Sequence, residues 1–321
     1  MSRIAVIGAG AWGTALAVQA ARAGRRATLW ARDAARANDL ATRRENPRLP
    51  GIALAAAIDV TSDLAALAAD LFLLAVPVQH LRPIAEALPA GAAVICAKGI
   101  EAATGRLPSE ILAELAPSRP VAVLTGPNFA AEIAAGLPAA AVIATHDAAL
   151  RARVMNALGS EHFRLYGNDD PLGAELGGAA KNVIAIAAGA VIGAGLGENA
   201  RAALITRGLA EMARLASALG GRAETMSGLS GLGDLVLTCT GTKSRNYRLG
   251  LALGRGEPLA AALAHQSGVT EGVATAPALV ARAAAAGCDV PIAAAVAAVL
   301  TERASLHAAM SALLARPRRD E

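Results

Sequence analysis

The sequence predicts an α/β protein of two domains: a doubly wound sheet with its helices over residues 1–170, followed by an all-helical domain over residues 171–321. Short apolar runs of strand length alternate with helical segments up to Asn168-Asp-Asp-Pro171, an order typical of such a sheet. Beyond Pro171 the strand signals cease, and alanine-rich helical segments follow. A chain of 321 residues is long enough for two domains with complete cores.

The first half should contain seven strands, each a short apolar run bounded by glycine, proline or polar residues. In chain order they are residues 3–7, 27–30, 71–76, 92–97, 121–124, 139–144 and 163–166. Helices are expected at residues 14–23, in a segment that begins with Asp63 as its N-cap, and at residues 80–88 and 148–158.

The second half should be a series of helices separated by the glycine turns Gly220-Gly221, Gly254-Arg-Gly256 and Gly287. Its helices are expected at residues 171–194, at 199–219, in a stretch through Asp234, and in segments beginning near Pro258, Thr275, Pro291 and Glu302. Residues 183–197 are uncharged but number only 15 and include four glycines. We interpret them as part of a buried helix and expect no integral membrane segment.

A glycine motif follows the first expected strand directly, as Gly8-Ala-Gly10-Ala-Trp-Gly13, and leads into a helix. In this setting the first glycine permits a tight turn, the second lets a pyrophosphate approach the backbone, and the third allows close helix packing. The phosphates would lie at the helix N-terminus. The motif therefore predicts a Rossmann-type dinucleotide-binding domain, the alternative being a glycine-rich turn without a ligand.

The end of the second strand bears on the choice of nicotinamide cofactor. Arg32 and then Asp33 follow that strand, and Arg36 lies four residues after Arg32. An acidic side chain here suits the ribose hydroxyls of NAD, whereas an arginine suits the extra phosphate of NADP. Because Arg32 is nearer the strand end, we expect NADP(H) to be preferred and NAD(H) to be possible. The alternative is that Arg32 is a solvated loop charge.

Composition excludes several classes of function. The net charge is +4, but the arginines are scattered and no basic run is interleaved with aromatic residues, so nucleic-acid binding is not expected. The three cysteines and five histidines show no metal-binding spacing, and we expect no metal. Widely separated cysteines that form no pairing pattern are typical of a reduced, cytoplasmic protein.

The distribution of lysine points to candidate catalytic residues. Of the 30 basic residues 27 are arginines, and only Lys98, Lys181 and Lys243 are lysines. Arginine can replace a lysine that only solvates the surface, but it cannot release a proton near neutral pH. A desolvated ammonium can. The three positions that keep lysine are therefore candidates for amine chemistry, although chance survival is the alternative for any one of them.

Asp234 is the natural partner for such a lysine. It lies among Leu232, Leu235, Val236 and Leu237, and burying a carboxylate alone would cost several kcal/mol or force it to protonate. Lys181 is the candidate partner. A helix through this stretch would place Thr238 on the same face as Asp234. The alternative is that Asp234 only caps a helix.

Other polar residues suit a small phosphorylated ligand. Ser244-Arg245-Asn246 provides a hydroxyl, a bidentate guanidinium and an amide in a row, a set that fits one phosphate. Lys98 and the loop of residues 125–130 each follow an expected strand, and ligands of parallel sheets gather at the strands' carboxyl ends. Arg245 could instead be a surface charge.

Longer motifs extend this pattern. They are Gly8-Ala-Gly-Ala-Trp-Gly-Thr-Ala-Leu16, Lys98-Gly-Ile-Glu101, Gly126-Pro-Asn-Phe-Ala-Ala-Glu-Ile133, Lys181-Asn182, Gly231-Leu-Gly-Asp-Leu-Val-Leu-Thr238, Ser244-Arg-Asn246 and Val269-Thr-Glu271. With them the chain resembles, along almost its whole length, the bacterial NAD(P)-dependent glycerol-3-phosphate dehydrogenases. Asn128 departs from the family pattern, in which serine is common, yet an amide can still bond to a phosphate or hydroxyl.

The resemblance implies a reversible reduction of dihydroxyacetone phosphate to sn-glycerol 3-phosphate that feeds glycerophospholipid synthesis, carried out by a homodimer. It implies that Lys181 donates and accepts the proton, with Asp234 as its partner. The cofactor-binding residues implied are Gly8, Gly10, Ala11, Trp12, Gly13, Arg32, Lys98, Ala130, Arg245, Val269 and Glu271. The substrate-binding residues implied are Lys98, Gly126, Asn128, Lys181, Asn182, Asp234, Thr238, Ser244, Arg245 and Asn246.

Two other functions stay open at this point. A related reductase acting on another 2-keto or 3-hydroxy acid would share the glycine motif and a catalytic lysine, but would not need Ser244-Arg-Asn246 as a phosphate clamp. A non-catalytic NADPH-binding sensor would keep the glycine motif without a reason to keep Lys181 together with Asp234.

Overall fold

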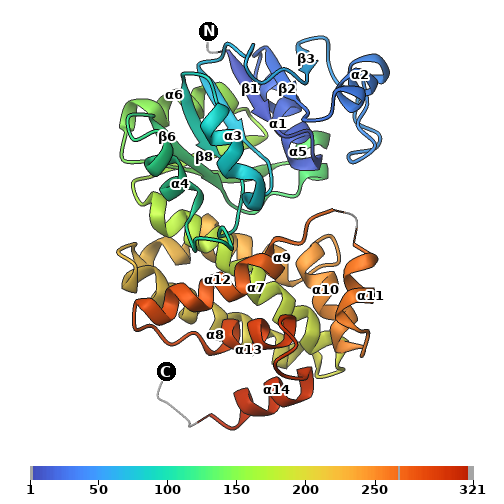
Figure 1. Ribbon diagram of the computed structural model, residues 1–321, viewed down its shortest axis with the longest axis vertical. Helices are drawn as coiled ribbons and strands as arrows, with labels where there is room; N and C mark the ends of the chain where they lie inside the picture. The colour runs from blue at the N-terminus through green and yellow to red at the C-terminus, as the bar shows by residue number, and fades with distance from the viewer. Residues whose placement is uncertain (1–2, 267, 317–321) are drawn as a thin grey trace. The chain divides into compact units, whose positions relative to one another are not determined.

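The computed structural model describes residues 3–266 and 268–316 (Figure 1). The chain divides into two compact units. The first comprises Met1–Lys98 and Leu107–Glu175, and the second comprises Gly99–Arg106 and Leu176–Glu321. The short segment Gly99–Arg106 belongs to the second unit, where Arg282 Nη1 donates to Gly105 O at 2.9 Å.

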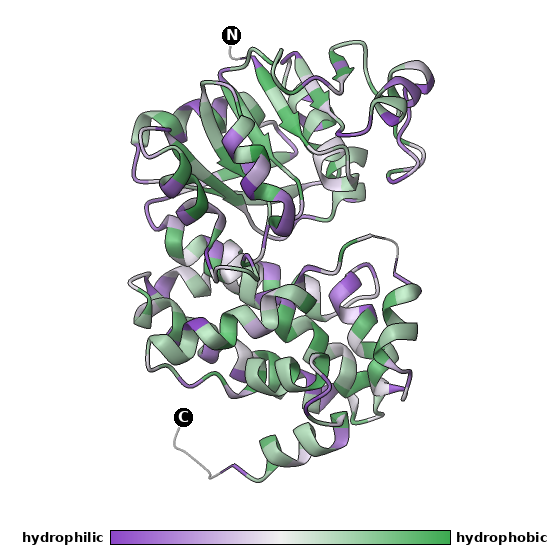
Figure 2. Ribbon diagram, in the orientation of Figure 1, coloured by the Kyte–Doolittle hydropathy of each residue, from purple (hydrophilic) through white to green (hydrophobic). Residues whose placement is uncertain are grey.

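The first unit is built on an eight-stranded sheet in the order β3-β2-β1-β4-β5-β6-β7-β8. The core strands are apolar along their whole length because helices cover both faces of such a sheet, and Figure 2 shows them as hydrophobic. The strands are β1 (Ile4–Ile7), β2 (Ala27–Trp30), β3 (Ile58–Thr61), β4 (Leu71–Leu74), β5 (Ala92–Ile95), β6 (Val121–Thr125), β7 (Ala139–Ala144) and β8 (Phe163–Asn168).

The helices of this unit pack their small and aliphatic side chains on the sheet. Leu16 and Ala20 of one helix and Val154 of another lie in a single buried cluster with the strands. The helices are α1 (Ala11–Arg22), α2 (Ala34–Arg43), α3 (Leu81–Ala87), α4 (Pro108–Leu115), α5 (Ala130–Ala135) and α6 (Ala148–Leu158), with a 3-10 turn at Val78–His80. The doubly wound sheet predicted from the sequence is confirmed, and all seven expected strands are present within one or two residues at each end.

One strand runs against the direction of its neighbour. β7 pairs antiparallel with β6, whereas the other pairs in the sheet are parallel. The six-residue α5 is about 9 Å long, and the five-residue β6 is about 16 Å long. The helix is therefore too short to carry the chain back to the edge where β6 began. Gly136, at a φ of 76°, ends α5, and β7 returns from the edge where β6 ended.

The prediction of a helix that begins at Asp63 is wrong. Asp63 Oδ1 accepts the N–H of Ala66 in a turn, and no helix forms between β3 and β4. This side-chain bond gives the backbone a local alternative to a helix. Sequence reasoning also missed edge strand β3, which has only four residues of mixed burial, and the short helices α2, α4 and α5.

The second unit is helical, as predicted. Its glycine turns at Gly220, Gly256 and Gly287 all have positive φ, which L side chains rarely adopt. Its helices are α7 (Pro171–Gly193), whose first five residues belong to the first unit, α8 (Gly197–Ala218), α9 (Asp234–Cys239), α10 (Arg245–Gly254), α11 (Leu259–Ala264), α12 (Glu271–Ala285), α13 (Pro291–Leu300) and α14 (Leu306–Leu314), with a 3-10 turn at Ala223–Ser227 and a π turn at Leu229–Gly233. Sequence reasoning did not anticipate α10 as a separate helix.

Helix α7 is the centre of this unit. It is long and apolar enough to span a membrane by length and composition, but 89% of its most apolar window is buried inside the protein, as in a core helix. Glycines let α10 cross it with backbones in contact. A Cβ added at Gly250 would lie 1.9 Å from Ile186 O, and one at Gly189 would lie 2.1 Å from Tyr247 O.

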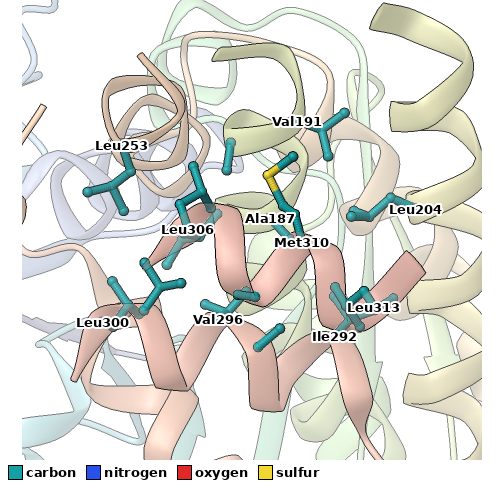
Figure 3. Close-up of a pocket in the computed structure, with 15 residues that line it drawn as sticks. Ala187, Val191, Leu204, Leu253, Ile292, Val296, Leu300, Leu306, Met310 and Leu313 are labelled. Atoms are coloured by element: carbon teal, nitrogen blue, oxygen red, sulfur yellow. The ribbon is translucent and has the colours of Figure 1, made fainter. Parts of the chain in front are cut away.

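An apolar pocket lies beside α7. Figure 3 shows its lining side chains, which come from α7, α8, α10, α13 and α14 and include Val191, Leu204 and Met310. All the lining residues are aliphatic or methionine. The pocket therefore lacks groups that could bind a phosphate or polarise a carbonyl, and the candidate site lies elsewhere.

A buried carboxylate links α8 to α13. Glu211 accepts the N–H groups of Ile292 and Ala293 at the start of α13, each at 2.9 Å. These N–H groups have no partner inside their own helix, so the carboxylate acts as a cap from a distant element. Burial raises the pKa of Glu211, although the two N–H bonds and Arg214 oppose the shift.

This raised pKa predicts a pH effect on stability. The folded protein keeps the Glu211 proton to a higher pH than the unfolded chain, so the free energy of unfolding falls as pH rises above the ordinary value of 4.5. Glu211→Gln removes this fall, because glutamine is neutral at every pH. Thermal unfolding of wild type and variant between pH 4.5 and 8 measures it. A Tm difference that does not change with pH would contradict the prediction, and the exposed Glu161→Gln is the control.

Candidate functional site

The glycine motif of the first unit forms a turn between β1 and α1. Gly8 has a φ of 116°, and a Cβ there would lie 2.9 Å from Val76 Cγ1. A Cβ at Gly13 would lie 1.9 Å from Gly8 O, so α1 packs directly on the turn. At Gly10 an added Cβ would meet nothing within 4 Å. The turn is thus crowded at both ends and open in the middle, which leaves room for a ligand against the backbone.

The N-terminus of α1 suits an anion. Gly10 is its N-cap and provides no side-chain acceptor, and the first turn contains no acidic residue. The first N–H groups of a helix lack partners and carry partial positive charge. A pyrophosphate would accept hydrogen bonds from these N–H groups and balance their positive charge, so the residues present fit a dinucleotide. Trp12 in this turn donates from Nε1 to Cys96 O at 3.1 Å, which ties α1 to the end of β5.

The loops after β5 and β6 meet at the same edge of the sheet. Lys98 Nζ donates to Gly126 O at 2.9 Å. Gly126 has a φ of 129°, and a Cβ there would lie 3.1 Å from Ala141 Cα. Asn128 follows in this loop; both of its amide atoms are buried, and neither has a hydrogen-bond partner in the described part of the chain. Ala130 begins α5.

The end of β2 presents an exposed arginine beside an aspartate that caps a helix. Asp33 is the N-cap of α2 and accepts the N–H of Arg36 at 2.7 Å. Arg32 is exposed. Burial and then repulsion from Arg48 lower the pKa of Arg36, and Asp33 partly offsets them. Two arginines, Arg32 and Arg36, therefore lie at the end of β2, while the carboxylate of Asp33 already accepts a backbone N–H.

In the second unit, Lys181 and Asp234 form a buried ion pair. Lys181 Nζ lies 2.8 Å from Asp234 Oδ1 and 2.7 Å from Thr238 Oγ1. The side chains of Lys181 and Asp234 are only 9% and 1% exposed. Thr238 in turn donates to Asp234 O at 2.6 Å. The predicted partnership of Lys181 with Asp234 is present, and so is the shared face of Asp234 and Thr238.

Glycines bring the two helices of this pair together. A Cβ at Gly177 would lie 2.6 Å from Ser230 O, so α7 touches the π turn at that point. Lys181 is one helical turn after Gly177 on the same face, and Asp234 follows the π turn directly. The close contact therefore sets the reach between ammonium and carboxylate. Asp234 is the first residue of α9 and Gly233 its N-cap, so the capping alternative is wrong.

Two amides connect α7, α10 and α12. Asn246 Nδ2 donates to Asn182 Oδ1 at 2.9 Å, and Asn246 Oδ1 accepts the N–H of Gly272 at 3.0 Å. Asn182 Nδ2 donates to Gly178 O at 3.3 Å. These contacts hold the start of α10 against α7. In the chain, α7 precedes Asp234 and α10 follows it.

The start of α10 gathers the predicted phosphate-binding residues. Ser244 is its N-cap and accepts the N–H of Tyr247 at 3.2 Å, and both Ser244 and Asn246 are buried. Arg245 between them is exposed. Its guanidinium lies against Gly268, where an added Cβ would be 2.9 Å from Nη1. Because Asn246 also holds Gly272, the exposed Val269 just before α12 and the half-buried Glu271 at its start lie near this turn.

The titratable groups near the ion pair do not suit thiol chemistry. Among the described residues no group of three or more His, Cys, Asp or Glu side chains could hold a metal. Cys239 lies near the ion pair, and burial raises its pKa to about 12. The thiol therefore stays protonated at neutral pH and is a poor nucleophile. The arrangement suits proton transfer from a buried ammonium.

One buried polar residue beside the glycine motif was missed by sequence reasoning. Asn46 is completely buried and bonds to the turn of residues 8–13. In the sequence its neighbour Pro47 marks only a break in the chain. The one available signal was an asparagine between the charged Glu45 and a proline, which does not identify a contact with a turn more than 30 residues earlier.

Comparison with known proteins gives a consistent result over the whole chain. Residues 3–151 match the sequence model described as the N-terminus of NAD-dependent glycerol-3-phosphate dehydrogenase, and residues 170–311 match that of its C-terminus. The chain is 60% identical over 319 residues to glycerol-3-phosphate dehydrogenase (NAD(P)+) of Acidiphilium cryptum, covering 99% of this chain and 98% of the relative. The crystal structure of glycerol-3-phosphate dehydrogenase from Coxiella burnetii superposes with a TM-score of 0.94 at 37% identity, covering 98% and 99% of the two chains.

Proposed function

The chain belongs to the NAD-dependent glycerol-3-phosphate dehydrogenase family, and on this premise we propose that it reduces dihydroxyacetone phosphate to sn-glycerol 3-phosphate with NAD(P)H. The reaction is reversible and feeds glycerophospholipid synthesis. The observation that carries the proposal is the buried pair of Lys181 and Asp234, supported by Thr238. A cofactor-binding sensor would have no use for it, which separates the proposal from that alternative.

Lys181 acts as the general acid. When bound, the reduced nicotinamide supplies the hydride that attacks the C2 carbonyl of the substrate. Negative charge then grows on the carbonyl oxygen, where the ammonium donates a hydrogen bond and then a proton. In the reverse direction the neutral amine accepts the proton. An arginine could not do this, because its guanidinium does not deprotonate in a protein.

Asp234 and Thr238 orient the ammonium. Each accepts a hydrogen bond from Lys181 Nζ, and the carboxylate balances its charge in a buried setting. Without this partner, burial would favour the neutral amine, which is the wrong form for donating a proton. The ion pair therefore keeps Lys181 protonated until it donates its proton to the carbonyl oxygen.

Three residues at the start of α10 are proposed to hold the substrate phosphate. Arg245 offers a bidentate fork, Ser244 a hydroxyl whose O–H can donate, and Asn246 an amide. Lys98 and Asn182 complete the substrate contacts, with Gly126 and Asn128 in the loop after β6. When the phosphate is held, the C2 carbonyl is held too, so it can face the nicotinamide in the orientation that the reaction requires.

The cofactor is NADP(H) by preference, with NAD(H) also used. The open space at Gly10 and the uncapped start of α1 support pyrophosphate binding. Arg32 supports binding of the 2′-phosphate, because the neighbouring carboxylate of Asp33 already accepts the N–H of Arg36 as a helix cap. Ala11, Trp12, Ala130, Val269 and Glu271 complete the proposed cofactor contacts. We further propose residues 1–170 as the dinucleotide-binding domain, residues 171–321 as the substrate domain, and a cytoplasmic homodimer as the active form.

Lys181→Arg tests the acid. The substitution keeps the charge but cannot donate a proton, so kcat should fall by about 10²–10⁴-fold. Lys181→Met is the second variant, in case a buried arginine distorts the site. NADPH absorbance decay with dihydroxyacetone phosphate and a small panel of keto acids measures the rate and the substrate class together. Lys243→Arg, at an exposed lysine, is the matched control. Turnover by either Lys181 variant close to that of wild type would reject Lys181 as the acid.

Arg245→Ala tests the phosphate clamp. Loss of a charge-assisted contact of about 1.5–3 kcal/mol should lower kcat/KM for dihydroxyacetone phosphate roughly 10- to 100-fold. Unphosphorylated dihydroxyacetone, which has no phosphate to lose, should be reduced at an almost unchanged rate. Equal loss with both substrates would show that Arg245 does not bind the phosphate.

Arg32→Ala tests the cofactor preference. Its guanidinium should contact only the 2′-phosphate, so the Kd for NADPH should rise roughly tenfold or more while the Kd for NADH stays the same. Titration of the intrinsic fluorescence of each reduced cofactor provides both constants. A parallel rise for the two cofactors would mean that Arg32 does not read the 2′-phosphate.

A further inference from the structure

A closed hydrogen-bond network connects the loop after α2 to the glycine motif. Asn46 Nδ2 donates to Thr14 Oγ1 at 2.6 Å and to Ala9 O at 3.2 Å. Arg36 Nη2 donates to Ala9 O at 2.8 Å and to Asn46 Oδ1 at 3.2 Å. The N–H of Arg48 donates to the same Asn46 Oδ1 at 3.0 Å. Both ends of the buried Asn46 amide are therefore in use, and the carbonyl of Ala9 is held from two sides.

The loop that carries Asn46 is itself well ordered by its own bonds. Leu49 donates its N–H to Asn46 O at 2.7 Å, and Gly51 donates its N–H to Glu45 Oε1 at 2.8 Å. Glu45 also forms a bridge with Ala53. Asn46 thus lies in a turn that is held by hydrogen bonds of its own, and its side chain contacts the glycine motif from there.

Holding the Ala9 carbonyl determines where the next N–H points. A peptide group is planar and trans, so the C=O of Ala9 and the N–H of Gly10 point in opposite directions. With Ala9 O directed at Asn46 and Arg36, the N–H of Gly10 faces away from them. No group in the described chain accepts a bond from that N–H. It lies at the open position of the motif, where an added Cβ would meet nothing within 4 Å.

We propose that Asn46 is a positioning residue for cofactor binding: together with Arg36 it fixes the Ala9–Gly10 peptide so that the Gly10 N–H donates to the cofactor pyrophosphate. This rests on the proposed NAD(P)H site at the glycine motif. In this proposal Arg36 has a different role from Arg32. Arg32 would select between the two cofactors through the 2′-phosphate, whereas the network acts on the pyrophosphate, which NADPH and NADH share.

Asn46→Ala tests the proposal, since it removes the network without changing the charge. The Kd values for NADPH and NADH, from fluorescence titration, should rise by the same factor, roughly 10- to 100-fold, the cost of losing one well-placed bond to a phosphate. The ratio of the two Kd values should not change. In the assay, the effect should appear in the KM for the cofactor, with kcat at saturating NADPH and the KM for dihydroxyacetone phosphate within about twofold of wild type.

Asn46→Ser is the second variant, small enough to fit and able to donate one bond, and its loss of affinity should be intermediate. Asn38→Ala, at an exposed asparagine of α2, is the matched control. Unchanged Kd values in a folded Asn46 variant, or a rise for NADPH alone, would overturn the proposal. So would a fall in kcat with unchanged Kd. Because the titrations need no substrate, an absence of activity toward dihydroxyacetone phosphate would count against the proposed function and not against this role.

Discussion

The buried ion pair of Lys181 and Asp234 is the contact on which the proposed chemistry of this chain depends. Removing two charges from water is costly, and the cost is offset only when geometry is good and the remaining donors and acceptors are satisfied. Here a threonine hydroxyl joins the pair at 2.7 Å, and glycines let the two helices approach. The pair is a poor means of stabilising a fold, yet a dry, oriented ammonium is what reduction of a carbonyl needs.

Close backbone approach recurs throughout the molecule and explains its composition. Aromatic residues make up only 2% of the sequence, so cores cannot be filled by large rings. Instead α7 meets the π turn at Gly177 and meets α10 at Gly189 and Gly250. The glycine motif of the first unit follows the same rule, with Gly13 against Gly8 O. Helices and turns in contact through backbone leave little freedom for rearrangement, which keeps short polar side chains in register with their partners.

Much of the fold could be predicted from local pattern. The strands at Ala27–Trp30 and Ala139–Ala144 have the expected bounds, and α7 begins at Pro171 as expected. The failures are equally local in cause. A turn capped by Asp63 replaced a helix that alanine-rich sequence favours, and β3 was too short and too mixed in burial to give a clear signal. The direction of β7 followed from the length of α5, which sequence reasoning had not identified.

By itself the sequence determined seven of the eight strands, the glycine motif in its strand-turn-helix setting, and the rare lysine Lys181 as the candidate partner for the aspartate of an apolar stretch. These signals lie within a few residues of one another, or in a residue type that is unusual for the chain. Only the tertiary structure decided the pairing of Asn182 with Asn246 and the contact of Asn46 with Ala9. An amide is compatible with many partners, so its choice depends on which distant backbones the packing brings within hydrogen-bond distance.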